Sequence, residues 1–419
     1  MAFLDEKDRL LWDEGITYID SRNVEVWNKL KNRIPPDKVY EITGKTKPHI
    51  ASVNQYNYWK ENRPKEFDNV RKIFFIDSYI AYMLSGNESF DYSSASNTLF
   101  FDINTFQWSL ELADSYEIDL SLFPQAVRTG SRNGKIRKNI SMELGLSDDI
   151  EILVGCHDQI SATVGGGAVK PGDALLGEGS TEALNVLLDS KQILKIKKAW
   201  LPIEPSVEQG TYFLLLSRFM HGNCIKWFVN NFAVGLKDTF EGQYSEIYDL
   251  LNENCPSHSN GVVFLPYLSN TYFSGYREAM GSFIGMDIGT DTYRLYRAVL
   301  EGLSCETLSM FSVLEECGIH ISEVAASGGA TKSSIYMQIK SDITKKKIYT
   351  LENSEAGILG LAMISAVEFG CFKNLEEAGK IFSKKKKSFQ PEKNMQNVIK
   401  NYELLSSSIR EAYSKKIYP

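Results

Sequence analysis

The chain has 419 residues, 43% of them hydrophobic and 24% charged, so it can bury large cores and is expected to form two domains. Its net charge of −7 argues against a nucleic-acid surface, because phosphate binding requires a basic face. No stretch is apolar for long enough to cross a membrane, and the acidic start MAFLDEKDRLL does not resemble a signal peptide. We therefore expect a cytoplasmic protein that binds a small molecule, with no nucleic-acid or membrane partner, and leave a homodimer open.

Helical and strand-like periodicities alternate along the chain, which favours an α/β fold. Residues 67–84 repeat apolar side chains at helical spacing up to a serine and a glycine, which are typical of a helix end. Residues 151–155 predict a short apolar strand. This strand delivers Asp158 at its C-terminal end, where open α/β sheets usually place ligand groups.

A glycine-rich segment, 165–179, separates an expected first domain, 1–166, from a second domain, 167–419. A helix is predicted to start near Ser333. The other elements predicted in the second domain are strands at 182–188, 211–217, 261–268 and 324–327, and a long buried helix at 292–317.

Two glycine-rich loops do not fit the standard nucleotide-binding motifs. In GEGSTEAL, Glu182 stands where a dinucleotide fingerprint needs its third glycine, and in SGGATKSS, Thr331 stands where a P-loop has glycine. Glycines after a strand still let the backbone approach a phosphate, and a following helix N-terminus offers free N–H groups. Two such loops in different halves of the chain indicate a nucleotide held between domains.

Taken together, the motifs resemble those of the FGGY carbohydrate kinases, the family of glycerol kinase and xylulokinase. They occur in family order: ITYIDSR at 16–22, FDYSSASNT at 90–98, VGCHDQ at 154–159, GEGSTEAL at 177–184, RAVLEG at 297–302 and ASGGATKSS at 326–334. The resemblance implies two ribonuclease-H-like domains of the actin and hexokinase type, with a catalytic cleft between them. It also implies a kinase that phosphorylates a hydroxyl of a small sugar or polyol with ATP.

The resemblance gives Asp158 a role, because it matches the aspartate of the family's GxxDQ motif. That residue accepts the proton of the substrate hydroxyl as the hydroxyl attacks the γ-phosphate. A carboxylate can serve here, since phosphoryl transfer through a loose transition state needs orientation and charge neutralisation more than a strong base. From the local sequence alone, the alternative is an aspartate that caps the helix beginning near Gln159.

The family pattern also implies which residues bind the substrates. On the sugar side they are Tyr18, Asp20, Arg22, Tyr92 and Gln159, although Asp20 and Arg22 could equally form an internal ion pair. On the ATP side they are Gly179, Ser180, Thr181, Gly328, Gly329, Ala330 and Ser333. Mg²⁺ is expected to bind mostly through ATP and water, and no metal ligand is assigned to the protein.

One departure from the family pattern concerns its first phosphate loop. Members ordinarily begin with a strand that carries DxGTT or DxGTS, whereas MAFLDEKDRLL matches a stretch inside the first domain. We therefore expect an N-terminally truncated first domain. The expected activity is phosphorylation of a xylulose-like ketose, with hexulose, aldonate and polyol as alternative substrates. A catalytically inactive relative that binds sugar or nucleotide, or has a regulatory role, is the alternative function.

Overall fold

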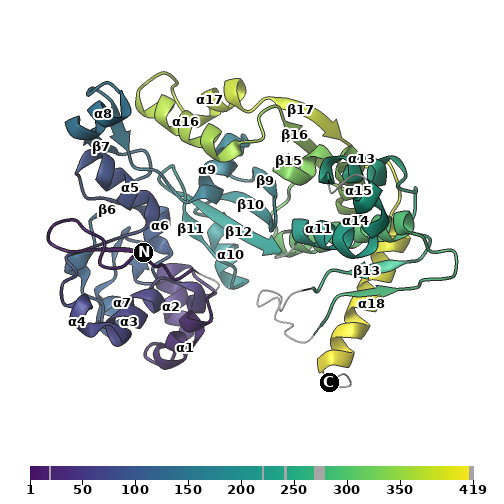
Figure 1. Cartoon of the computed structure of the whole chain (residues 1–419), viewed down its shortest axis with the longest axis horizontal. Helices are drawn as coiled ribbons and strands as arrows, with labels where there is room; N and C mark the ends of the chain where they lie inside the picture. The colour runs from purple at the N-terminus through teal and green to yellow at the C-terminus, as the bar shows by residue number, and fades with distance from the viewer. Residues whose placement is uncertain (18–19, 219–220, 240–242, 269–278, 415–419) are drawn as a thin grey trace. The chain divides into compact units, whose positions relative to one another are not determined.

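The computed structural model describes residues 1–17, 20–218, 221–239, 243–268 and 279–414. The chain forms two compact units, each assembled from separate stretches. The first unit contains residues 1–164, 187–214 and 360–378, and the second contains 165–186, 215–359 and 379–419. Both units mix helices with strands, so the predicted α/β class is confirmed (Figure 1). The predicted single boundary after residue 166 stays a prediction. In the structure, two later stretches of the chain, 187–214 and 360–378, also belong to the first unit.

In the first unit, short strand pairs are combined with helices. Strands β1 and β2, β4 and β5, and β7 and β8 pair antiparallel, whereas β3 and β6 pair parallel. The strands are β1 Ala2–Leu4, β2 Lys72–Phe74, β3 Phe90–Asp91, β4 Phe101–Asp102, β5 Gln107–Trp108, β6 Ala126–Val127, β7 Arg132–Lys135, β8 Glu151–Leu153 and β11 Glu204–Pro205.

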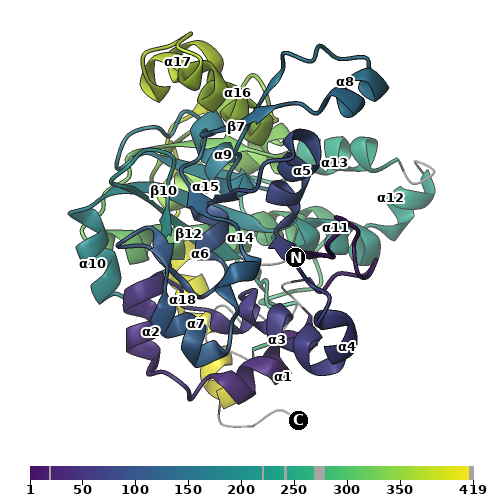
Figure 2. The same cartoon turned by 90° about the vertical axis from the view of Figure 1, so that its left-hand side faces the viewer.

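The helices of the first unit are mostly short, and α1 packs against α3 (Figure 2). The α-helices before residue 200 are α1 Ser21–Leu30, α2 Pro36–Thr43, α3 Val53–Asn62, α4 Pro64–Phe67, α5 Ile76–Ser85, α6 Tyr92–Ser96, α7 Leu110–Tyr116, α8 Lys138–Leu144, α9 Asp158–Gly165 and α10 Gln192–Lys198. Two later helices, which begin or end in the second unit, are α16 Ala356–Glu368 and α17 Leu375–Phe382. Short 3₁₀ turns lie at Pro48–Ile50 and Leu120–Leu122.

The single helix predicted over 67–84 is wrong in its first half. Helix α4 ends at Phe67, strand β2 follows, and only α5 is helical. Strand β2 forms because it pairs with β1 from the start of the chain, with Ala2 opposite Phe74. A short apolar run fits a buried strand as well as a buried helix, so a distant partner decides between them. The predicted helix end is confirmed, since Gly86 forms a left-handed C-cap.

The second unit is built on a mixed sheet whose strands lie in the order β12, β10, β9, β15, β16 and β17. Strands β9, β15 and β16 run parallel, whereas β10 is antiparallel to β9 and β17 is antiparallel to β16. The start of β12 also pairs antiparallel with β11, with Phe213 opposite Glu204. These paired residues belong to the first unit. The bounds are β9 Ala174–Glu178, β10 Glu182–Asp189, β12 Thr211–Arg218, β15 Glu323–Ser327, β16 Lys347–Leu351 and β17 Lys385–Phe389, with a separate hairpin of β13 Val263–Leu265 and β14 Ser282–Ile284.

The predicted elements of the second half are confirmed, with shifts at their ends. The long buried helix is α14, Thr292–Glu316, and α15, Ser334–Thr344, begins directly after Ser333, whose side chain caps it. These two helices pack against each other (Figure 1). The remaining helices are α11 His221–Phe232, α12 Val234–Thr239, α13 Tyr244–Glu253, a 3₁₀ turn at Gly329–Lys332 and α18 Gln396–Ser414.

Many apolar side chains are buried in the cores of the two units. In the first unit the rings of Phe90, Phe100, Trp108 and Phe123 pack together, and in the second unit α14 is buried along most of its length. Within the described ranges, none of the helices has both the length and the apolar character that crossing a bilayer requires.

Candidate active site

Asp158 lies where the chain leaves strand β8 and enters helix α9. Val154 continues the backbone pairing beyond the end of β8, because its N–H donates to the carbonyl oxygen of Ser131 and its carbonyl oxygen accepts from the N–H of Gly130. Asp158 is the first residue of α9, and its side chain is 83% exposed. The N–H groups of Ile160 and Ser161 donate to the carbonyl oxygen of His157, 2.9 and 3.1 Å away. The helix-cap interpretation of Asp158 is therefore wrong, and its carboxylate is available to a solute.

His157 connects Asp158 to a buried ion pair. Its Nε2 lies 3.3 Å from Oδ1 of Asp158, and its Nδ1 lies 3.1 Å from Oε2 of Glu204. The Nζ atom of Lys45 lies 2.6 Å from Oε1 of Glu204 and donates to Asn97. This chain of contacts holds the imidazole, so that one of its nitrogens faces the Asp158 carboxylate.

Charge partners set the protonation of this group. Burial alone would raise the pKa of Glu204, but the charges of Lys45 and His157 lower it to about 2. Burial likewise opposes a charge on His157, yet the neighbouring Glu204 carboxylate raises the pKa of His157 above its ordinary value. Burial lowers the pKa of Lys45. Glu204 is therefore ionised throughout the neutral range, and the imidazole is biased towards its charged form.

Asp91 supports the backbone in front of Asp158. Its carboxylate is buried and caps α6 by accepting from the N–H groups of Ser93 and Ser94 at 2.8 and 3.1 Å. The hydroxyl of Ser93 also contacts Asp91, and it accepts from the N–H of His157 at 2.9 Å. Burial raises the pKa of Asp91 to about 6. The Asp91 cap thus fixes the position of the residue that precedes the candidate base.

Replacing Asp91 with asparagine is expected to remove a pH dependence of stability. A folded pKa of about 6, above roughly 3.9 in the unfolded chain, means that the native state loses about 2–3 kcal/mol as pH rises from 4 to 6. Asparagine carries no charge and still accepts the cap hydrogen bonds, so urea unfolding at pH 4 to 7 should show a flatter profile. Asp119 caps a turn in the same way but is exposed, and Asp119→Asn should keep the wild-type slope. An unchanged slope in Asp91→Asn would contradict the assignment.

The predicted sugar-side residues lie on several elements of the first unit. Tyr18 lies outside the described residues. Asp20 caps α1 and forms an ion pair with Arg22, with Nη2 to Oδ2 at 2.7 Å, so the internal ion pair left open by the sequence is present. Tyr92 is half-buried and packs against the ring of Phe106. Gln159 follows Asp158 in the first turn of α9.

The predicted ATP-side residues come together within the second unit. Gly179, Ser180 and Thr181 form the turn between β9 and β10, and the first two are exposed. Gly328 has φ of 104°, and a Cβ atom there would lie 2.6 Å from the carbonyl oxygen of Glu178, so only glycine fits. Gly329 and Ala330 follow in the 3₁₀ turn.

Ser333 closes the second of these two segments. Its hydroxyl oxygen accepts from the N–H of Tyr336 as the α15 cap, and the hydroxyl donates to Asn252 at 2.8 Å. The turn 179–181 and the loop 328–333 therefore lie side by side at the C-terminal ends of the parallel strands β9 and β15. Ligands of open α/β sheets bind at such ends.

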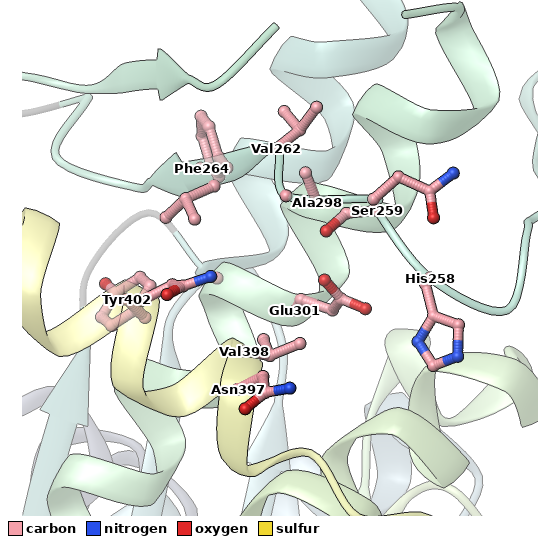
Figure 3. Close-up of a pocket in the computed structure, with 14 residues that line it drawn as sticks. His258, Ser259, Val262, Phe264, Ala298, Glu301, Asn397, Val398 and Tyr402 are labelled. Atoms are coloured by element: carbon pink, nitrogen blue, oxygen red, sulfur yellow. The ribbon is translucent and has the colours of Figure 1, made fainter.

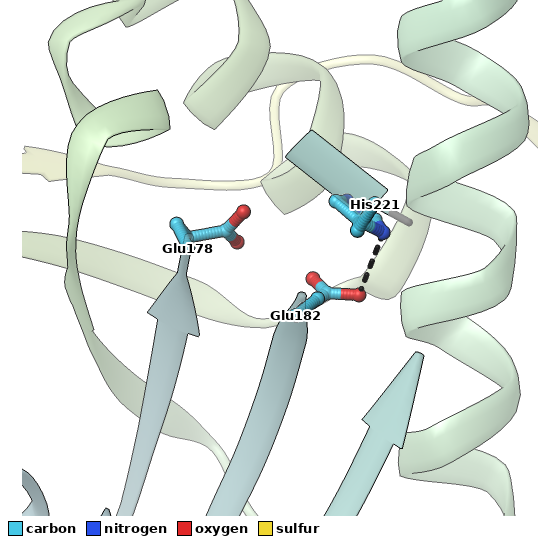
Figure 4. Close-up of side chains that lie close together, drawn as sticks. All are labelled: Glu178, Glu182 and His221. Atoms are coloured by element: carbon cyan, nitrogen blue, oxygen red, sulfur yellow. Dashed lines mark ion pairs between the residues drawn. The ribbon is translucent and has the colours of Figure 1, made fainter. Parts of the chain in front are cut away.

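A buried ion cluster lies directly beneath the turn 179–181, and the sequence did not single it out. Glu178 and Glu182 flank the turn, and His221 begins α11 (Figure 4). Lys340 comes from α15 and contacts both glutamates. The side chains of Glu178, Glu182 and Lys340 are fully buried. The two glutamates in GEGSTEAL were the only sequence signal, because nothing in the sequence links them to Lys340.

A cavity of about 170 Å³ lies elsewhere in the second unit, between β13, α14 and α18 (Figure 3). The carboxylate of Glu301 lies among Ser259, His258 and Val398 (Figure 3). It forms a buried ion pair with Arg297, from Nε to Oε1 at 2.6 Å. Of the residues predicted to bind sugar or ATP, those that the structure describes do not line this cavity.

Comparisons with known proteins show the family of the chain. Two family models match the chain: the FGGY family of carbohydrate kinases, N-terminal domain, at residues 1–165, and its C-terminal domain at residues 178–369. The xylulose kinase of Staphylococcus epidermidis is 24% identical to the chain, and the match covers 93% of this chain and 78% of the relative.

Solved structures show the same fold. The ligand-bound xylulose kinase from Lactobacillus acidophilus has a TM-score of 0.84 at 22% identity, covering 99% of this chain and 83% of that one. The glycerol kinase of Plasmodium falciparum with ADP has a TM-score of 0.84 at 22% identity, covering 98% and 81%.

Fold and sequence thus place the chain among the two-domain α/β phosphotransferases. It belongs to the FGGY family of carbohydrate kinases. It is therefore an enzyme that transfers a phosphoryl group from ATP to a carbohydrate. The absence of the family's first phosphate loop stays a prediction.

Proposed function

We propose that the chain transfers the γ-phosphoryl group of ATP to a hydroxyl of a small ketose, with Asp158 as the catalytic base. The hydroxyl oxygen attacks the γ-phosphorus and forms the new P–O bond, while the bond from that phosphorus to the β–γ bridging oxygen breaks. The hydroxyl proton passes to the Asp158 carboxylate, and the electron pair of the broken bond stays on ADP. The products are ADP and a sugar phosphate.

The observation that carries this proposal is the exposed carboxylate of Asp158 with an imidazole beside it. The carboxylate is 83% exposed, so a substrate hydroxyl can reach it. His157 contacts one carboxylate oxygen and is itself held by Glu204. An oriented acceptor within hydrogen-bond reach is what proton removal during phosphoryl transfer requires.

The substrate class rests on the names of the relatives. The matched proteins from Staphylococcus epidermidis and Lactobacillus acidophilus are xylulose kinases, which favours a xylulose-like ketose. Gln159, next to the base, is suited to hydrogen-bonding sugar hydroxyls, and Tyr92 offers a ring face. Asp20 and Arg22 form an ion pair with each other. They would therefore bind sugar only through hydrogen-bonding atoms that this ion pair does not use.

On the nucleotide side, Ser180 and Thr181 offer hydroxyl and N–H groups to the γ-phosphate. The loop from Gly328 to Ser333 offers backbone N–H groups and the start of α15 to the α- and β-phosphates. Mg²⁺ would neutralise phosphate charge and would be held mainly by ATP and water. Of the nearby carboxylates, Glu178 already contacts the Lys340 ammonium and is not available as a ligand.

The test is sugar-dependent release of ADP by the purified chain. A panel of pentuloses, hexuloses, aldonates and polyols should show turnover with at least one ketose, and with xylulose above the others. Circular dichroism and thermal melting on the same sample report whether the chain is folded. No sugar-dependent ADP release by a folded sample would overturn the proposal and favour the inactive binding or regulatory protein.

A further inference from the structure

We propose that Lys340, with Glu178, Glu182 and His221, positions the turn 179–181 for the phosphates of ATP. This inference rests on the proposed function, because it takes the turn to face the nucleotide. The four residues do not touch the nucleotide in this proposal. They act through the backbone of the turn, which makes them positioning residues.

The Lys340 ammonium closes the base of the turn. Glu178 is the last residue of β9 and Glu182 is the first residue of β10, and the two face each other in the strand register. Lys340 donates to Oε1 of Glu178 and, at 2.5 Å, to Oε1 of Glu182. The three side chains are fully buried. One cation thus ties both ends of a three-residue turn to helix α15.

Further contacts tie the same turn to α11 and α14. Nδ1 of His221 lies 3.2 Å from Oε2 of Glu182 (Figure 4). Thr307 of α14 donates to Oε1 of Glu182 at 2.7 Å. A Cβ atom on Gly222 would lie 2.2 Å from the carbonyl oxygen of Gly179, so α11 packs directly on the turn. The turn is therefore held from three helices of the second unit, α11, α14 and α15.

The cluster also sets the spacing between the two ATP-side segments. Lys340 lies on α15, whose capping residue Ser333 ends the loop that begins at Gly328. At its other end that loop rests on the backbone of Glu178. Hydrogen bonds to phosphate weaken when the donors move by a fraction of an ångström. A rigid link between the two segments should therefore increase the affinity for the nucleotide.

The cluster contains its own counter-charge, the Lys340 ammonium. One carboxylate oxygen each from Glu178 and Glu182 and a ring nitrogen of His221 lie within 4.8 Å of one another, which could suit a metal, but the Lys340 ammonium already contacts both carboxylates. Burial raises the pKa of Glu178, whereas His221 and Lys340 outweigh burial and lower the pKa of Glu182. The permanent cation offsets acidic charge that would otherwise repel the phosphates.

The main test replaces the ion pair with neutral groups of similar size. In Lys340→Gln/Glu178→Gln, Glu182 keeps His221 and Thr307, and no buried carboxylate is orphaned. We expect KM for ATP and the Kd for ADP with Mg²⁺, measured by calorimetry, to rise about tenfold. KM for the sugar should stay within about twofold, and kcat should fall by less than about threefold. Glu178→Gln alone, which keeps Lys340, should raise both nucleotide constants about threefold and serves if the double variant does not fold.

The matched control is Arg297→Gln/Glu301→Gln, which removes another buried ion pair of the same unit. It should leave both nucleotide constants within about twofold of wild type. Unchanged ADP affinity in folded Lys340→Gln/Glu178→Gln, an equal loss in the control, or a wild-type chain that binds no ADP would each overturn the inference. A wild-type chain that binds ADP but releases none from ATP would overturn only the proposed function, since the ADP titrations still measure the cluster.

Discussion

Replacing Asp158 with asparagine is expected to lower kcat by about 10²–10⁴-fold, the usual range for loss of a positioned acid or base. Asparagine keeps the size of the side chain and its contact with His157, but it cannot accept the proton of the attacking hydroxyl. KM for sugar and for ATP should change little, because the lost interaction is made only in the transition state. Steady-state ADP release with the preferred sugar measures this split.

Asp149 provides the control for that variant. It lies just before β8, its side chain is 81% exposed, and its carboxylate pairs with Lys135 at 2.7 Å. Asp149→Asn removes an equally exposed charge from the same part of the chain and should leave kcat unchanged. If Asp158→Asn retained wild-type kcat, Asp158 would not be the base, and a loss confined to KM would make it a substrate ligand.

Replacing Lys45 with methionine is expected to lower the free energy of unfolding by about 3–5 kcal/mol. The substitution keeps most of the aliphatic stem but leaves the buried Glu204 carboxylate with only His157 as a counter-charge, and breaking a buried pair from one side costs about this much. Total stabilities are about 5–15 kcal/mol, so the loss is large. Urea unfolding at pH 7 measures it.

Two further measurements separate charge from packing at this ion pair. Lys45→Met/Glu204→Gln removes the orphaned carboxylate and should recover more than half of the loss. The depressed folded pKa of Glu204, about 2, contributes stability that is present above roughly pH 4 and is lost as pH falls towards 2. The difference between wild type and Lys45→Met should therefore shrink over that interval. A double variant as unstable as the single one would point to lost packing instead.

Local patterns were enough to predict several elements of this chain. The helix at 334–344 begins after Ser333 and α5 ends at Gly86, because capping needs only residues within one turn. The segment 67–74 could not be predicted in this way. Its apolar run suits either a helix or a strand, and the pairing of β2 with β1 settles it.

In the candidate site, too, local motifs could be predicted from the sequence, whereas contacts between distant residues could not. The GxxDQ match singled out Asp158, and the two glycine-rich loops indicated the phosphate-facing segments. An aspartate two residues before a pair of serines is a local signal that could have indicated the Asp91 cap, whereas nothing local links Asp91 to His157. Glu204 and Lys45 gave no signal, since Glu204 lies 47 residues from His157 and 159 from Lys45.

The sequence by itself determined the family, the α/β class and the identity of the candidate base. These follow from the order of short motifs and from periodicities that span a few residues. Only the tertiary structure decided which charges meet: Lys340 reaches Glu178 across 162 residues, and His157 stands between Asp158 and Glu204. Such pairs form where folding removes water from distant side chains together, and a buried charge persists only with a partner.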